Sequence, residues 1–464
     1  MNNIVFKNEW RLFTRNKAML AAAILLFSCG IYAIQYGHTF NQRQLNVLHT
    51  IDTSQASKEQ RYLTYYNADT TTKEGKTNYK YAQDAYMSDW FAQKPLYKKP
   101  TPFASLSIGQ NDNQAYYYKA WILNNIYSNK MQEIRNPDKL LAGNFDLSFV
   151  FLYLFPLFII AFGYNALSDE KEKGTYNLLK VQGQTISHFI FNKFLFQFMV
   201  VAVLATLLTG IAVVWNSISI NDNSFKIISW WGISVVYVSF WYALLYAIIS
   251  FNKSSSINAL VLVSSWVLFL LFIPAMVNYF IQIKYPENER LSMIQADRSG
   301  DYKIWELTRK IKIDSFYAML PQYKTAPVTD TNTVDFPAYM EISQRSNNAE
   351  GAKYDSLIVQ RLDAALTANL TNPVFATQYS YNQIAQSEIN HFVQFSKSVA
   401  AYQQKRRYFI FDNMLSGKPF TKEGYKSYPV YRPAAKQSSS NTIWVLLIWI
   451  GGLVTIGFIN LKKV

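Results

Sequence analysis

A short run of alternating charges is the part of this sequence best suited to recognising a partner. Glu170-Lys171-Glu172-Lys173-Gly174-Thr175 is followed by the apolar pair Leu178-Leu179. The charged groups can form ion pairs with a soluble partner, Gly174 can end or redirect the backbone, and Thr175 can cap a new helix. Leu178 and Leu179 give that helix an apolar side that a partner can bury. The charges alone would equally fit an ordinary solvated loop with Glu–Lys pairs.

Residues suited to catalysis or metal binding are few. No His-Glu-x-x-His pattern or Gly-x-Ser-x-Gly elbow occurs, and Cys29 is the single cysteine, which excludes an internal disulfide or a thiolate metal cluster. Ser416-Gly417-Lys418-Pro419 fails as a nucleotide-binding loop, because the first glycine is missing and proline replaces the Ser or Thr. We therefore expect no catalytic residue, no metal site and no cofactor in this chain. The four histidines are isolated from one another: His38, His49, His188 and His391.

Apolar runs supply the elements that must hold the charged loop in place. Crossing a bilayer takes about 20 mostly apolar residues, and six segments qualify. None has Asp, Glu, Lys or Arg in its middle, which argues against a proton- or sodium-driven carrier. The segments are Ala18–Tyr36, Leu147–Ala166, Phe194–Val214, Trp230–Phe251, Ile257–Phe280 and Thr442–Ile459.

Basic residues in the short flanks predict the orientation of these spans. With six spans, all of these flanks fall on one side, so both termini are expected in the cytoplasm. The net charge of +15 is scattered among acids, with no dense basic stripe beyond Lys405-Arg406-Arg407, so we expect contact with membrane lipid and not with nucleic acid. The flanking residues are Lys7, Arg11, Arg15, Lys17, Lys171, Lys173, Lys180, Lys193, Lys253, Lys462 and Lys463.

The predicted fold is mainly α: a polytopic membrane protein with six transmembrane helices and two extracytoplasmic, largely helical domains. The expected units are a cytoplasmic interfacial helix (1–17), the first span (18–36), extracytoplasmic domain one (37–145), spans two to five (146–280) with a cytoplasmic loop (167–193), extracytoplasmic domain two (281–441), and the sixth span with a cytoplasmic tail (442–464).

The two polar segments, which are the extracytoplasmic domains 37–145 and 281–441, are rich in aromatic residues and are expected to fold. Within the first, Tyr79–Phe91 and Ala115–Met131 have the character of helices. Within the second, apolar residues recur every three or four positions from Ala385 to Tyr402, which predicts one long amphipathic helix over Tyr381–Leu415.

The charged loop resembles the cytoplasmic loop of type-2 ABC transporter permeases. That family pattern has a Glu, a basic residue, a second acidic position, Gly-Thr, a Leu pair, a short turn and a Lys that opens the next span. All of these occur between Ser168 and Lys193, although Tyr176 stands where the family usually has Leu. Long outer segments after the first and fifth spans extend the resemblance over nearly the whole chain, as in a bacterial branch with two such domains. The stretch from Asn372 to Tyr402 is also similar to the second outer domain of that branch.

In that family the cytoplasmic loop forms a coupling helix that sits in a groove of the ATPase. The resemblance implies that Glu170, Glu172, Gly174, Thr175, Leu178 and Leu179 form the ATPase-coupling element, with the short loop Asn252–Ser256 as a second contact. It further implies a permease subunit of an ATP-driven ABC-type exporter or mechanotransmission complex in the inner (plasma) membrane. Its partners would be a cytosolic ABC ATPase that binds the ATP and a second permease, identical or paralogous, and this chain would not be an enzyme.

A different hypothesis also fits the layout. A membrane-anchored sensor or structural protein could bind envelope partners through the outer domains without transport. The sequence leaves open which cargo is handled, whether it crosses the bundle, and whether the two permeases are identical.

Overall fold

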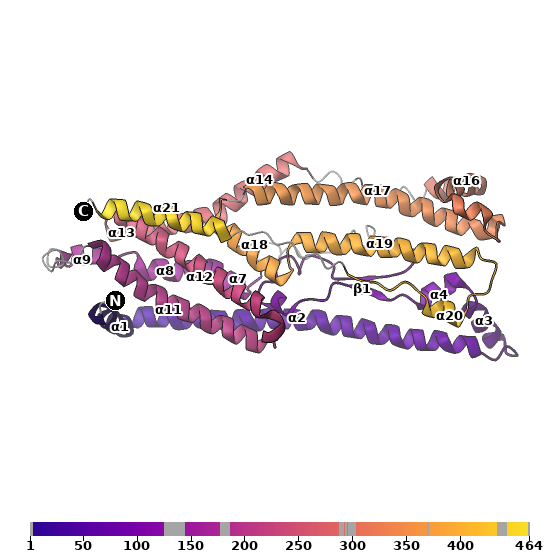
Figure 1. The fold of residues 1–464 in the computed structure, drawn as a ribbon, viewed down its shortest axis with the longest axis horizontal. Coiled ribbons are helices and arrows are strands. Elements are labelled where there is room, and N and C mark those ends of the chain that lie inside the picture. The colour runs from indigo at the N-terminus through magenta and orange to yellow at the C-terminus, as the bar shows by residue number, and fades with distance from the viewer. Residues whose placement is uncertain are drawn as a thin grey trace.

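The computed structural model describes residues 3–124, 144–176, 186–286, 292, 295, 303–368, 371–433 and 443–462. These residues are almost entirely helical, and the strands among them are β1 (Pro95–Tyr97) and β2 (Tyr117–Lys119), which pair antiparallel. The molecule is long and narrow, and both ends of the chain lie at the same end of it (Figure 1). The predicted mainly α fold is confirmed.

Six helical segments of the described chain are long and apolar enough to cross a membrane, as predicted. The apolar stretches of these segments match the roughly 20 residues that a helix needs to cross a bilayer. In chain order the spans contain α2 (Lys17–Thr64), α7 to α9 (Leu147–Phe149, Phe155–Gly163 and Ser168–Glu172), α11 (Ile186–Trp215), α12 (Ile220–Ser250), α13 with α14 (Ser255–Val267 and Ile273–Lys284), and α21 (Ile443–Leu461).

The first span is only the beginning of a much longer helix. Helix α2 continues past Tyr36 to Thr64 and has 48 residues in all, about 72 Å at 1.5 Å per residue, because no proline interrupts it. Gly37 allows the 3₁₀ turn η2 (Pro102–Ser105) to pack directly on the helix, because a Cβ there would lie 1.7 Å from the Ser105 carbonyl oxygen. One continuous rod therefore joins the membrane part to the far end of the molecule (Figure 1).

Helix α12 forms the centre of the membrane part. It packs against α8, α11 and α21, and Trp230, Tyr237 and Trp241 on it are at most 1% exposed. Helices α13 and α21 instead present large apolar side chains outward, such as Leu260 and Ile448. Outward apolar surface is what helices in contact with lipid require.

The second span contains a π turn, η3 (Val150–Leu154), just before Pro156. In a regular helix the Leu152 carbonyl would accept a hydrogen bond from position 156, but proline has no N–H to donate. The hydroxyl of Tyr237 on α12 donates to this carbonyl instead, at 2.9 Å. The irregular turn is thereby tied to the central helix.

The fifth span has a similar π turn, η4 (Leu268–Phe272), before Pro274. Here the carbonyl without a main-chain donor is that of Phe269, five residues before the proline, because the π pattern would pair it with the N–H that Pro274 lacks. The replacement donor is the side-chain amide of Asn372, which lies 3.0 Å from the Phe269 carbonyl oxygen. Asn372 also caps α18 (Pro373–Ala385), so this helix of the second polar segment is attached to the membrane part.

Helix α18 packs against the distal ends of the spans. The ring of Tyr381 stacks on Trp230 at a centroid distance of 4.2 Å, and its hydroxyl shares a 2.7 Å hydrogen bond with Ser234. Trp449 of α21 donates to the carbonyl of Thr371 at 2.6 Å. Although α18 lies within the range 281–441 assigned to the second outer domain, it is held by α12, η4 and α21.

Both polar segments contribute to the far end of the molecule, which we call the head (Figure 1). Their apolar side chains share one core: the ring of Tyr62 lies 4.9 Å from that of Phe91 and 5.0 Å from that of Tyr425. The head consists of α2 beyond Gly37, α3 (Lys73–Ala82), α4 (Ala85–Phe91), β1, β2, α16 (Arg309–Met319), α17 (Thr331–Ala368), α19 (Ile389–Met414) and α20 (Lys422–Lys426).

A buried ion pair fastens the two segments of the head together. The guanidinium of Arg406 on α19 donates to the Asp89 carboxylate of α4 at 2.5 Å, and both residues are at most 1% exposed. Arg406 also donates to the Ala92 carbonyl at 2.7 Å, and the second Asp89 oxygen accepts from the Ile122 amide. These bonds satisfy much of the polar surface that burial removes from water.

Three helix predictions for the head were wrong in detail. Instead of a helix over Ala115–Met131, the described residues form strand β2, and residues 125–131 lie outside the described part. Tyr79–Phe91 is two helices, because Asp84 caps a new one at Ala85. The helix predicted over Tyr381–Leu415 is interrupted after Ala385, where Gln386 adopts a left-handed conformation with φ 56° and separates α18 from α19.

Candidate functional site

The charged segment singled out in the sequence forms helix α9 and the turn after it. This segment lies at the end of the molecule that also carries both ends of the chain, opposite the head (Figure 1). Asp169 and Glu170 occupy the first helical turn, where the helix dipole favours negative charge. Gly174 then ends the helix in a left-handed conformation, φ +74°, which glycine adopts without steric cost.

Glu170 is directed inward and organises the turn. The hydroxyl of Thr175 donates to its carboxylate and lies 3.1 Å from its main-chain carbonyl. Lys193 of α11 approaches the same carboxylate at 3.9 Å and also donates to the Ala166 carbonyl at 3.3 Å. The carboxylate of Glu170 therefore fixes the turn to the third span.

Glu172 joins this turn to the beginning of the fifth span. Its carboxylate accepts a 2.7 Å hydrogen bond from the Ser255 hydroxyl, and the Ser255 amide lies at 3.4 Å. The Ser255 hydroxyl is also 2.6 Å from that of Ser168. Because Ser255 is the first residue of α13, the negative charge of Glu172 lies at a helix N-terminus, where it is favourable.

The outer surface of the segment is basic. Lys171 and Lys173 are exposed. Lys173 pairs with Asp169 one turn earlier at 2.7 Å, and the Lys171 ammonium lies 4.7 Å from the centre of the Tyr176 ring. A partner approaching this end would meet these ammonium groups together with the exposed side chain of Glu172.

The N-terminal helix α1 (Asn3–Arg15) packs beside the same site. Phe6 contacts Phe196 of α11 edge-to-face at 5.1 Å, and Phe13 contacts Phe162 at 5.3 Å. Glu9 is only 7% exposed. Burial raises the pKa of its carboxyl above 4.5, Lys193 opposes that shift, and the negative charge of Glu170 adds to it.

Four of the six residues predicted to couple to a partner come together here, namely Glu170, Glu172, Gly174 and Thr175. Leu178 and Leu179 lie outside the described residues. Reasoning from sequence missed the pairing of Glu172 with Ser255, although the loop containing Ser255 was expected at the same end. It also missed Glu9. The sequence could have pointed to this residue, because it is an acidic side chain among apolar neighbours. Within the described ranges, no three histidine, cysteine or carboxylate side chains gather to hold a metal ion.

A comparison with protein families decides the nature of the molecule. The family model described as ABC-2 family transporter protein matches residues 3–464. The chain belongs to this family. No curated protein and no solved structure matches it significantly. The resemblance to type-2 ABC permeases is therefore confirmed over nearly the whole chain.

Family membership fixes the general character of this ABC-2 transporter protein. It is a multi-pass membrane component of an ABC transporter, and in this family such components are generally not catalytic themselves. Membership also implies association with an ABC ATPase in general.

Proposed function

We propose that this chain is the permease subunit of an ATP-driven exporter or mechanotransmission complex, and that α9 with its following turn receives the force of a separate cytosolic ATPase. ATP would bind only to that ATPase, and a second permease, identical or paralogous, would complete the complex. The termini and α9 would face the cytoplasm of a cell with this chain in its inner membrane, and the head would lie outside.

The observation that carries this proposal is the bridge between Glu172 and Ser255. It joins the turn after the second span to the start of the fifth, while Glu170 and Lys193 join that turn to the third. A push on α9 would reach three spans at once, because the contacts are direct hydrogen bonds and an ion pair and not flexible linkers. The displaced segment is short and is held by contacts to two neighbouring spans, as a coupling element needs to be.

The distal attachments support a path from the membrane to the head. Helix α2 is continuous, and α18 is fastened to the spans through Asn372, Tyr381 and Thr371. A tilt of the spans would therefore move the head even without cargo passing through the bundle.

The test is co-purification of the full chain with its ATPase, followed by measurement of ATPase activity. Glu172→Lys is expected to lower both recovery of a nucleotide-binding subunit and its activity. Glu423→Lys makes the same charge change on an exposed position of α20 in the head and should alter neither. Glu170→Lys is a poorer test, because it disrupts internal contacts with both Thr175 and Lys193. Glu172→Lys disrupts the internal contact with Ser255, and Ser255→Ala removes that hydrogen bond without changing the charge of α9.

Ser255→Ala separates binding from transmission. This change removes the internal hydrogen bond but leaves the surface of α9 as it is, so the ATPase should still co-purify while its coupling to the permease weakens. If the wild-type chain elutes alone, or only with envelope proteins, across several mild detergents, the sensor or structural hypothesis replaces this one.

A further inference from the structure

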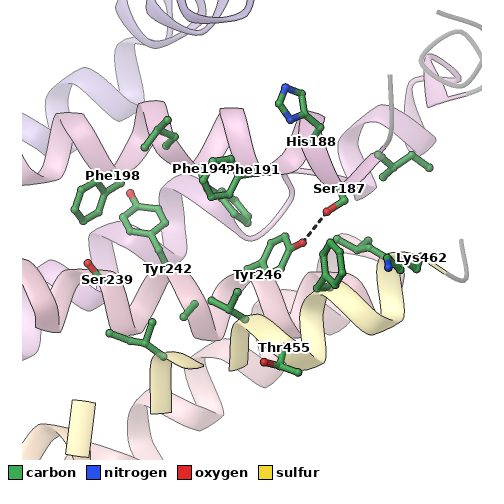
Figure 2. Close-up of a pocket in the computed structure, with 17 residues that line it drawn as sticks. Ser187, His188, Phe191, Phe194, Phe198, Ser239, Tyr242, Tyr246, Thr455 and Lys462 are labelled. Atoms are coloured by element: carbon green, nitrogen blue, oxygen red, sulfur yellow. Dashed lines mark hydrogen bonds between the residues drawn. The ribbon is translucent and has the colours of Figure 1, made fainter. Parts of the chain in front are cut away.

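The membrane part contains an apolar groove, one wall of which is formed by α11. Lys193 of α11, which approaches Glu170 in the turn after the second span, is not among the residues that line this groove. Figure 2 shows it between α11 and α21, with Tyr242 and Tyr246 of α12 on its floor. Its volume is about 1,120 Å³, above the roughly 300–1,000 Å³ of most small-molecule pockets. Helix α21 packs closely on α12, since a Cβ on Gly457 would lie 2.4 Å from the Tyr246 ring.

The walls of the groove suit hydrocarbon. Phe191 and Leu195 project from α11, and Val454 and Phe458 project from α21. Phe191, Val454 and Phe458 are 45–56% exposed, so the groove opens sideways to the region that lipid tails occupy.

The length of the groove corresponds to one leaflet. From Ser187 to Phe198 along α11 there are eleven residue steps, and from Lys462 to Ile450 along α21 there are twelve. At 1.5 Å per residue both walls extend about 17 Å, roughly half of the 30 Å hydrocarbon core. A helix from a second permease would be expected to pack along the full thickness, whereas a lipid of one leaflet fits this length.

Polar groups gather at the end of the groove nearest the termini. Lys462 and the exposed His188 lie at this end, where Ser187 and Tyr246 share a 2.9 Å hydrogen bond (Figure 2). Among the residues that the structure describes, no carboxylate forms an ion pair with Lys462; its ammonium lies 4.5 Å from the Phe458 ring centre. A cation at the interface above an apolar slot complements a phosphate joined to acyl chains.

We propose that this groove binds one anionic phospholipid of the leaflet at the termini-bearing end, with its phosphate near Lys462 and its chains between α11 and α21. This bound lipid would fill the gap between the third and sixth spans. The proposal does not depend on the ATPase partner or on the role of α9.

The test uses native mass spectrometry of the purified full chain, with any subunits that co-purify, after addition of phosphatidylglycerol or phosphatidylcholine at equal concentrations. The expected result is retention of one phosphatidylglycerol per chain at concentrations where phosphatidylcholine is lost. Lys462→Gln should weaken phosphatidylglycerol binding by about fivefold, the typical effect of one basic residue at a charged membrane surface. Val454→Trp should abolish retention of either lipid by filling the groove.

Matched controls make the outcomes decisive. Lys253→Gln removes a charge at the same end outside the groove, and Ile448→Trp adds the same bulk to an outward position of α21 that is 74% exposed; neither should change lipid retention. Equal retention by all four variants would overturn the proposal and leave only non-specific lipid around the spans. Loss of a second chain from the complex in Val454→Trp, with lipid unchanged, would overturn it in favour of a permease contact. If Val454→Trp does not fold, the comparison of Lys462→Gln with Lys253→Gln still decides.

Discussion

The side-chain amide of Asn372 donates a hydrogen bond to the carbonyl of Phe269, the acceptor left without a partner because Pro274 has no N–H. In the π turn before Pro274, each amide bonds to the carbonyl five residues earlier, as Ile273 does to Leu268. The next donor in that series would be residue 274. A helix from the second polar segment thus completes the hydrogen bonding of the fifth span, and the two become parts of one structure.

Replacing Asn372 should separate its two roles. Asn372→Ser keeps an acceptor for the amide of Val374 at the start of α18 but is too short to reach Phe269, so we expect a loss of about 1–3 kcal/mol from the unsatisfied buried carbonyl. Asn372→Ala should lose about 1 kcal/mol more with the cap. The midpoint of thermal unfolding in detergent should fall in that order, and hydrogen exchange in α18 should rise. Equal midpoints for wild type and Asn372→Ser would show that the bond to Phe269 contributes nothing.

The buried pair Asp89–Arg406 should be costly to break and less costly to remove. Asp89→Ala leaves the Arg406 charge buried without its partner, for which we expect a loss of about 3–5 kcal/mol. Asp89→Leu combined with Arg406→Met removes both charges and should recover much of that loss. The measurement is the unfolding midpoint of the full chain, followed by limited proteolysis of the head. A double variant as unstable as Asp89→Ala would mean that the hydrogen bonds to Ala92 and Ile122, and not the charges, stabilise this contact.

Gly174 offers a test of backbone shape in the coupling segment without a steric clash. Among the described residues other than its two chain neighbours, no atom lies within 4 Å of the position a Cβ on Gly174 would occupy, so we expect Gly174→Ala to act through the left-handed conformation, at a cost of about 1–2 kcal/mol. Gly174→Asn should cost less, because asparagine tolerates this conformation. We expect Gly174→Ala to reduce ATPase coupling and Gly174→Asn to preserve most of it, with the unfolding midpoint falling more in Gly174→Ala than in Gly174→Asn. Similar coupling in both variants and the wild type would remove the shape of this turn from the mechanism.

The sequence predicted the six spans well because a bilayer imposes both their length and their composition. It did not predict the length of α2, since the apolar signal ends near Tyr36 while nothing in the polar residues that follow stops the helix. Strand β2 was missed because its identity depends on pairing with Pro95–Tyr97, and strand preferences are set largely by such neighbours. The attachment of α18 was also hidden, because Tyr381 meets Ser234 across 147 positions.

The candidate site shows the same division between local and distant contacts. Gly174 ending a helix and Thr175 bonding back to Glu170 were accessible from local pattern. The bond between Glu172 and Ser255 joins residues 83 positions apart, and no local rule predicts which exposed carboxylate will meet which hydroxyl. The fold of six spans had to be known before that contact could be inferred.

Glu9 should make the stability of the N-terminal helix depend on pH. Since burial raises its pKa in the folded state, the folded protein binds more protons than the unfolded one just above the unperturbed value of 4.5. Stability should therefore fall as the pH rises from 4.5 through the raised pKa. Glu9→Gln removes the titrating group, so this decline should become smaller and the variant should gain stability relative to wild type as the pH rises to 7. Thermal unfolding in detergent between pH 4.5 and 8 measures the difference. Glu74→Gln, at an exposed position in the first turn of α3, serves as the control and should follow the wild-type profile. A variant profile parallel to wild type would show that Glu9 is solvated and that its charge does not affect the packing of α1, which then rests on aromatic contacts such as those of Phe6 and Phe13.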